Sequence, residues 1–318
     1  MKRKIALVCA AAMALSLAAC GNTASTTSES TASESTASES SATAEAAGEE
    51  AAASDFDNTQ AITVITREEG SGTRGAFIEL TGVEEKNDAG EKVDNTSAGA
   101  ATQNSTNGVM TTVANDETAI GYISLGSLND TVKAVTVGGV AASAETVKDG
   151  TYTLARPFNI VTNGDATDPV AVDFINYCMS IDGQALATED GYIGSDDAAA
   201  FESTQPSGSI TVGGSSSVSP LMEKLIEAYE GVNPNASIEL LTTDSTVGVS
   251  GALDGTYTIG MASRELKDSE VEAGAKATVL AMDGIAVVVN PANPIEDLTI
   301  DQIKSIYTGE TTTWDAIQ

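Results

Sequence analysis

Short runs of β-branched residues alternate with amphipathic stretches along most of the chain. Residues 210–212 form one such run and lead into a segment of small residues at 213–217, GGSSS. Beyond it, apolar residues recur every three or four positions, at Val218, Leu221, Met222, Leu225, Ile226 and Tyr229. This spacing is that of one face of a helix. The pattern therefore predicts a strand, a tight loop and a helix in direct succession.

The same succession occurs near the start of the globular part, which we expect to begin at Phe56. Residues 62–65 predict a strand, and residues 67–74, REEGSGTR, form a Gly/Ser/Thr loop that begins with an arginine. A helix is expected from about Thr73, because apolar residues follow the loop.

The remaining pattern predicts strands at 119–125, 132–137, 154–162, 237–241, 257–261 and 285–289, and helices at 109–113, 169–179, 267–273 and 298–307, with a short helix ending at 253. Pro157 places the strand at 154–162 near a sheet edge, because proline lacks a backbone N–H. Residues 81–104 are expected to be an irregular insertion and 201–207 a surface connector. Strands that alternate with helices indicate an α/β fold with mostly parallel sheets.

Both loops carry the groups from which proteins build anion sites. A strand that turns directly into a helix aims backbone N–H groups, hydroxyls and the positive end of the helix dipole at one point. Two such helix N-termini, supplied by separate halves of the chain, can close on one small oxyanion from opposite sides. Each loop alone also fits ordinary turn and capping chemistry, so the hypothesis depends on the pair.

The first 20 residues are typical of a secretory signal. Basic residues near Met1 precede an apolar run at 5–17, which is too short for a comfortable transmembrane helix. The run ends in LAAC, which resembles a bacterial lipobox and predicts a lipid anchor at Cys20; an ordinary signal peptide with an incidental cysteine is the alternative. Residues 21–55 are almost wholly Ser, Thr, Ala, Glu and Gly, and are expected to form a disordered tether to the membrane.

Composition excludes several classes of function. With 46 acidic and 15 basic residues the net charge is −31, which argues against nucleic acid, since a polyanion needs a basic surface. A small anion is not excluded, because exposed charges are screened beyond about 10 Å at 0.1 M salt. The chain has no histidine, which removes Ser-His-Asp and Cys-His catalysis and histidine metal sites. Cys178 is expected to be a buried apolar residue, and neither a metal nor a cofactor is predicted.

Several motifs together resemble a known family. ITVGGSSSVSPL, DSTVGVSGALDGTYTIGMASREL, DGIAVVVNP and LTIDQIKSIYTGETTTWDAI are similar to the first half of the phosphate-binding proteins of bacterial phosphate ABC importers. ITVITREEGSGTRGAF, AIGYISLGSL and residues 174–193 are similar to the second half. The order of the halves is exchanged. We expect a natural circular permutation, with the usual termini joined through 201–209 and new termini opened between 317 and 62; a fragment of a longer duplicated chain is the alternative.

The resemblance implies a two-lobed, periplasmic-binding-protein-like α/β fold of type II, in which two hinge strands let the lobes close on the ligand. One lobe would comprise residues 56–157 and 288–318, the other residues 158–287, with hinge strands at 154–162 and 285–289. The implied ligand contacts are Ser216, Ser217 and Ser245 on one lobe and Arg67, Ser71, Gly72 and Thr73 on the other.

The chain departs from the family at one position. The family commonly has an aspartate after the A-S of one strand, where it accepts the proton of phosphate and so rejects sulfate; here that residue is Arg264. Asp244 and Glu69 are candidates for a replacement acceptor. Alternatively, Arg264 contacts the ligand as a second cation, or pairs with Glu265 or Glu68 at the rim.

Three functions remain as hypotheses. The first is a monomeric solute-binding lipoprotein, anchored on the extracytoplasmic face of the cell membrane, that delivers inorganic phosphate to the permease subunits of an ABC importer and catalyses nothing. The second binds another tetrahedral oxyanion, such as sulfate or molybdate. The third is a hydrolase with a serine nucleophile; it is disfavoured because a base other than histidine would be needed and neither loop reads G-x-S-x-G.

Overall fold

The computed structural model describes residues 56–317, so the predicted signal, the tether and Cys20 lie outside the described residues. The main sheet is built from β1 (Thr63–Arg67), β4 (Ala101–Gln103), β5 (Ala119–Ser124), β6 (Lys133–Ala134), β8 (Ala155–Asn163), β9 (Gly208–Ser215), β10 (Ala236–Thr243), β11 (Ile259–Ala262) and β12 (Ala275–Val289). Its strand order is β10-β9-β11-β8-β12-β5-β1-β4, with β6 also paired to β12. Two short pairs stand apart from it: β2 (Glu84–Lys86) with β3 (Lys92–Asp94), and β7 (Thr136–Val137) with β13 (Asp297–Leu298).

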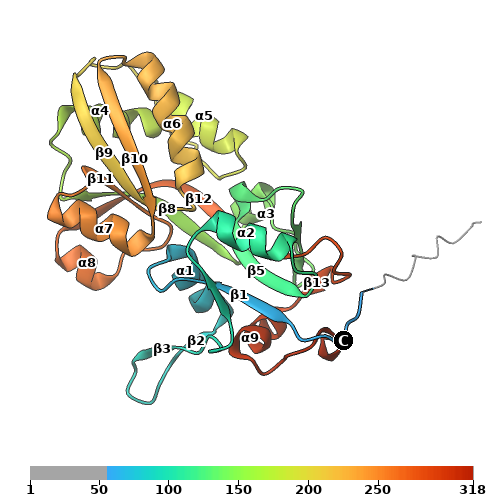
Figure 1. The fold of residues 1–318 in the computed structure, drawn as a ribbon. Helices are drawn as coiled ribbons and strands as arrows, with labels where there is room; N and C mark the ends of the chain where they lie inside the picture. Colours follow the sequence, from blue (N-terminus) through green and yellow to red (C-terminus); the bar gives the residue numbers. More distant parts are fainter. Residues whose placement is uncertain (1–55, 318) are drawn as a thin grey trace, which may run out of the picture. The chain divides into compact units, whose positions relative to one another are not determined.

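The helices are α1 (Gly72–Thr81), α2 (Thr106–Ala114), α3 (Ala144–Lys148), α4 (Pro169–Cys178), α5 (Ile181–Glu189), α6 (Ser219–Val232), α7 (Ser245–Asp254), α8 (Asp268–Glu272) and α9 (Ile300–Thr308), with 3-10 turns η1 (Leu125–Ser127) and η2 (Trp314–Ala316). Figure 1 shows α4, α5 and α6 near β9 and β10, whereas α1 and α9 lie near β1. Within residues 56–317 no helix combines the length and apolar character needed to cross a bilayer.

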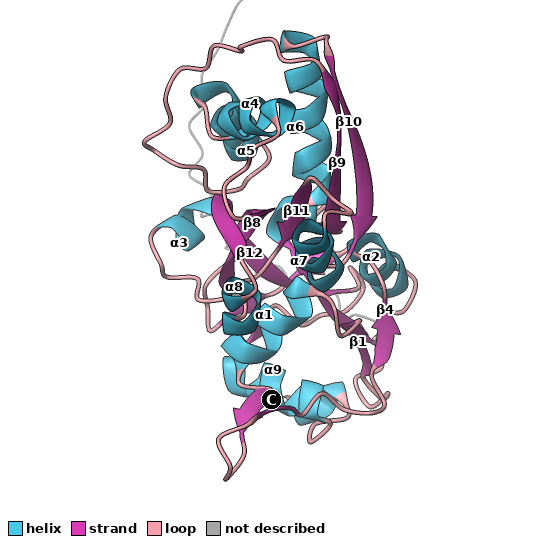
Figure 2. Cartoon of the chain, turned by 90° about the vertical axis from the view of Figure 1, so that its left-hand side faces the viewer, coloured by secondary structure: helices cyan, strands magenta, loops and turns pink. Residues whose placement is uncertain are grey.

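Buried apolar side chains form two main groups, which we call core groups. In one group, α4, α5 and α6 pack around Phe174, Leu225 and Tyr229. In the other, α1, β5 and α9 pack around Phe77 and Tyr122. The long strand β12 contributes to both groups, and Figure 2 shows β8 and β12 between the helices of the two.

We propose that these groups are the cores of two lobes. The arginine lobe comprises residues 56–157 and 288–317, and the serine lobe comprises residues 158–287. Burial in each lobe follows the sequence pattern: the apolar face predicted for α6 is buried throughout, and Thr299 caps α9 as expected. Cys178 is fully buried.

The centre of the sheet differs from the expectation of mostly parallel pairing. The outer pairs are parallel, but β8 pairs antiparallel with both β11 and β12, and β12 pairs antiparallel with β5. The chain passes between the two core groups once in each direction, through β8 and β12, so these neighbours must run in opposite directions.

The predicted edge position of the strand containing Pro157 is wrong, because β8 has a partner on each side. Proline is tolerated there because β11 pairs only with residues 159–161 of β8. On that side Pro157 therefore has no ladder hydrogen bond to lose.

Four further regions differ from what the sequence predicted. Residues 81–104 are not simply irregular, since β4 pairs with β1. The predicted strand at 132–137 is two short strands with different partners. The loop expected at 213–217 begins late, because Gly213 to Ser215 still pair with β10. The strand predicted at 285–289 starts at Ala275, because residues 275–284 pair with β8 and extend it.

Candidate functional site

Arg67 ends β1, and its side chain reaches the serine lobe. Only 2% of its surface is exposed. Its backbone N–H donates to the buried Tyr122 hydroxyl at 3.1 Å, and its Nε and Nη2 donate to Glu68 at 2.8 and 2.7 Å. Nη2 also donates to Ser216 Oγ, 3.1 Å away. The guanidinium fork is thus fixed by Glu68 and directed at the GGSSS segment.

Hydroxyls at three helix N-termini meet beside this arginine. Thr73 lies in the first turn of α1 and its Oγ1 is 2.8 Å from Ser217 Oγ, just before α6. Thr106, the first residue of α2, places its Oγ1 3.2 Å from the same Ser217 Oγ. Ser71 caps α1 by accepting from the Arg74 backbone N–H at 3.3 Å. The first-turn N–H groups of α1, from Gly72 and Thr73, have no partner within the helix and can serve an anion.

A fourth helix begins beside the same residues. Ser245 opens α7, is fully buried, and accepts from the Ser263 backbone N–H at 3.0 Å. Ser263 Oγ also lies 2.9 Å from Ser215 Oγ. Gly72 of the arginine lobe packs directly on this cluster: a Cβ there would lie 2.3 Å from Ser245 Oγ and 2.7 Å from Ser263 Oγ. Only glycine permits so close an approach of the two lobes.

The structure therefore brings the seven implied ligand-contact residues together around facing loops of the two lobes. It treats the three candidate acceptor or cation residues differently. Asp244 is half-buried and caps α7 by accepting from Val247 N–H at 2.8 Å. Its carboxylate lies against the arginine loop, since a Cβ on Gly70 would be 2.5 Å from Oδ1. Glu69 is exposed.

Arg264 is bound to a neighbour on its own lobe. Its Nη1 and Nη2 donate to the two carboxylate oxygens of Glu270 at 2.8 and 2.7 Å, and Nη1 also donates to the Glu265 backbone carbonyl at 2.9 Å. Burial raises the pKa of Glu270, but the hydrogen bonds from Arg264 and from the Lys267 backbone N–H outweigh it and hold that pKa below its usual value. The partner of Arg264 is therefore Glu270, neither the Glu265 side chain nor Glu68.

Arg156 was missed by sequence reasoning. It lies on β8 with 2% of its surface exposed, and its Nη2 is 3.0 Å from Oδ2 of Asp283 on β12. Its Nη1 donates to Thr73 Oγ1 at 2.6 Å and to the Ser263 carbonyl at 3.0 Å. Burial lowers the pKa of Arg156 and raises that of Asp283, while their mutual attraction opposes both shifts. An arginine within a predicted strand was the available signal.

The hydroxyls of Thr106, Ser215 and Ser263 were also missed as site groups. Their local sequence gives no distinctive signal, because serine and threonine at strand ends and helix starts are equally typical of turn and capping chemistry.

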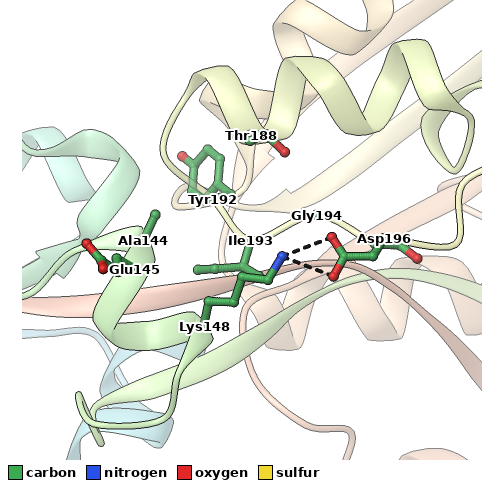
Figure 3. Close-up of a pocket in the computed structure, with 9 residues that line it drawn as sticks. Ala144, Glu145, Lys148, Thr188, Tyr192, Ile193, Gly194 and Asp196 are labelled. Atoms are coloured by element: carbon green, nitrogen blue, oxygen red, sulfur yellow. Dashed lines mark hydrogen bonds and ion pairs between the residues drawn. The ribbon is translucent and has the colours of Figure 1, made fainter.

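None of these groups lines the pocket drawn in Figure 3. It has a volume of about 340 Å³ and is lined by α3 and the segment that follows α5, including Lys148, Tyr192 and Asp196. Lys148 Nζ donates to both carboxylate oxygens of Asp196, at 2.9 and 3.0 Å. No predicted site residue lines it.

Two α/β core groups, joined by crossing strands and facing each other through helix N-termini, define a substrate-binding protein of the periplasmic-binding-protein type. The chain matches the family model described as PBP superfamily domain over residues 26–182 and 199–317. Phosphate-binding protein PstS 2 of Streptococcus agalactiae serotype V is 51% identical over 253 residues, which is 80% of this chain and 86% of that protein.

A crystal structure of the phosphate-binding protein of a phosphate ABC transporter from Streptococcus pneumoniae TIGR4 has a TM-score of 0.65 and 44% identity, and the match covers 81% of this chain and 100% of that chain. Phosphate-binding protein PstS of Borreliella burgdorferi is 32% identical over 108 residues, which is 34% of this chain and 39% of that protein. The chain belongs to the PstS family of phosphate-binding proteins. The α/β fold of periplasmic-binding-protein type is thereby confirmed, and the relatives are binding proteins of a transporter, not enzymes.

Proposed function

We propose that this protein binds inorganic phosphate between its two lobes and presents it to an ABC importer. The observation that carries the proposal is the pair of contacts between lobes, Arg67 to Ser216 and Thr73 to Ser217, which join residues 149 and 144 positions apart. These contacts support a single site in which donors from both lobes surround one ligand. The names of the relatives support phosphate as that ligand.

The chemistry of the converging groups suits a compact oxyanion. The hydroxyls of Thr73, Ser217 and Ser245 now bond to other protein groups, and each can rotate its proton toward an anion oxygen. Arg67 adds a charged donor, and the N-termini of the surrounding helices add positive potential. In a buried setting these interactions are stronger than in water.

Calorimetric titration of the purified protein with phosphate tests the proposal. We expect saturable binding of phosphate that a large excess of sulfate or molybdate does not displace. Absence of saturable phosphate heat would contradict the proposal, and displacement by sulfate or molybdate at equal concentration would favour the broader oxyanion binder.

Asp244 is the better of the two proposed acceptors for the proton that phosphate carries and sulfate lacks. Its carboxylate lies against the arginine loop at Gly70, whereas Glu69 is exposed. Asp244→Asn keeps the size of the side chain and the capping oxygen but removes the charge. We expect Asp244→Asn to lower the ratio of phosphate affinity to sulfate affinity. Glu69→Gln is the matched control, which should leave this ratio unchanged. An unchanged ratio in Asp244→Asn would exclude this role.

We also propose the circular permutation. Residues near both ends of the described chain are neighbours: the Ile62 N–H donates to the Thr312 carbonyl, and the Asp315 N–H to the Asn58 carbonyl, each at 2.8 Å. A short linker could therefore join them, as the usual family order would require. The match of only 108 residues to the Borreliella burgdorferi protein also fits an exchanged order. A variant with residues 317 and 56 joined and the chain opened within 201–207 should fold and bind phosphate; a folded variant without binding would count against the proposal.

The remaining part of the proposal concerns location and partners. A lipid anchor at Cys20 would hold the protein on the extracytoplasmic face of the membrane as a monomer beside the permease subunits. Cys20→Ser should release the protein from the membrane fraction, and wild type should co-purify with the permease after crosslinking. Retention of the Cys20→Ser protein on the membrane would argue against the anchor. Light scattering of the purified Cys20→Ser protein in the absence of detergent measures the oligomeric state, which we expect to be monomeric.

A further inference from the structure

Arg156 is a charged group in the site that the ligand contacts predicted above do not include. It reaches the site from β8, one of the two strands that run between the core groups. Asp283 on the facing strand β12 holds its Nε and Nη2 at 3.3 and 3.0 Å. Asp283 is itself fixed by the Ser124 hydroxyl at 2.9 Å. The guanidinium is therefore oriented from behind, with Nη1 left for the site.

Nη1 has one partner on each lobe. On the arginine lobe it donates to Thr73 Oγ1 at 2.6 Å, and on the serine lobe it donates to the Ser263 carbonyl at 3.0 Å. The Asn159 side chain, also on β8, donates to the next carbonyl, that of Arg264, at 2.8 Å. The crossing strand thus holds the end of β11 and the start of α1 at the same time.

The contact with Arg156 limits the directions in which the Thr73 hydroxyl can point. A threonine hydroxyl has one proton to donate and two lone pairs. Since Arg156 has no acceptor, Thr73 must accept from it, and its proton is directed elsewhere. Ser217 Oγ lies 2.8 Å away on the other lobe, and either hydroxyl can be the donor in that contact. Arg67 acts on Ser216 in the same manner, by donating to its Oγ.

We propose that Arg156 is a positioning residue of the anion site, which fixes the Thr73 hydroxyl as a donor to the ligand and couples that donor to closure of the lobes through Ser263. The inference rests on the proposed binding of phosphate. It extends the site from its two loops to the strands between the lobes, and it gives the ion pair with Asp283 a function besides stability.

The test is a cycle of variants titrated with inorganic phosphate. Arg156→Gln together with Asp283→Asn removes both charges, so that no unpaired charge stays buried. We expect the affinity of this double variant for phosphate to fall about tenfold or more, because a charged donor behind a buried ligand contact is lost. The midpoint of thermal unfolding without ligand should stay close to that of the wild type.

Thr73→Val supplies the readout that a purely structural role would not change. In the wild-type background it should weaken phosphate binding by about tenfold. In the double variant the same substitution should cost less than about threefold, because the hydroxyl is no longer held as a donor. If Thr73→Val weakens phosphate binding by the same factor in both backgrounds, the inference is overturned. Wild-type phosphate affinity in the double variant would also overturn it.

Two further outcomes distinguish failure of this inference from failure of the proposed function. If the double variant does not fold, Arg156→Lys keeps the charge but offers a single ammonium in place of the fork, and the Thr73→Val penalty should again shrink; an undiminished penalty refutes the inference. If the wild type itself binds no phosphate, the proposed function fails, whereas phosphate binding with no coupling between Thr73 and Arg156 refutes only this inference.

Discussion

Arg67→Ala tests the anion site most directly. The side chain is buried, its fork is held by Glu68, and Nη2 is 3.1 Å from Ser216 Oγ on the other lobe. Removing one charged partner of a buried ion costs about 2–5 kcal/mol of binding free energy. Because Glu68 already neutralises part of the charge and keeps 22% of its side-chain surface exposed, we expect the lower end, about 2 kcal/mol or about 30-fold in Kd.

That figure is a lower bound, because the truncation also leaves the Glu68 carboxylate unpaired beside the bound anion. Isothermal titration with phosphate at one fixed pH and salt concentration measures the change. Arg67→Lys should fall between wild type and Arg67→Ala, since one ammonium cannot reproduce the fork to Glu68 and Ser216. Lys148→Ala is the control: its pair with Asp196 is exposed and lies away from the site. A Kd for Arg67→Ala within threefold of wild type would refute the reasoning.

Three further predictions follow from the same contacts. Gly72→Ala should fold but bind phosphate at least about tenfold more weakly, because the added methyl would meet Ser245 Oγ at 2.3 Å and hold the lobes apart. Gly75→Ala is the control and should bind phosphate normally, because its nearest contact is at 3.7 Å. Equal titration curves for the two variants would refute this prediction. Arg264→Ala should leave the phosphate Kd within about threefold, because Glu270 holds the guanidinium, but should lower the free energy of unfolding by about 1–3 kcal/mol; a large rise in Kd would instead make it a ligand contact. The depressed pKa of Glu270 means that its pair adds stability above the ordinary glutamate pKa and loses it as pH falls through the folded value, so acid unfolding monitored by circular dichroism should lose this contribution in Arg264→Ala.

The two loops of the site were readable from the sequence because their signals are local. A strand, a run of Gly and Ser and an amphipathic helix occupy neighbouring positions, so the start of α6 and the start of α1 follow from residues 210–229 and 62–78 alone. The same holds for the cap of α9 at Thr299, which depends on a residue three positions away. The absence of histidine likewise needs no structure to narrow the chemistry.

Tertiary structure alone decided which polar groups meet. Arg156 and Asp283 are 127 positions apart, and no local pattern marks an arginine in an apolar strand as a neighbour of Thr73 rather than of solvent. Arg264 had several acidic candidates nearby, and the fold of the chain into α8, six positions further on, selected Glu270. Proline is tolerated at position 157 of this central strand because β11 does not extend that far along β8. Helix and loop signals arise from neighbours along the chain, whereas the pairing of Arg156 with Asp283 and the surroundings of Pro157 arise from distant segments packed together, which sequence spacing does not encode.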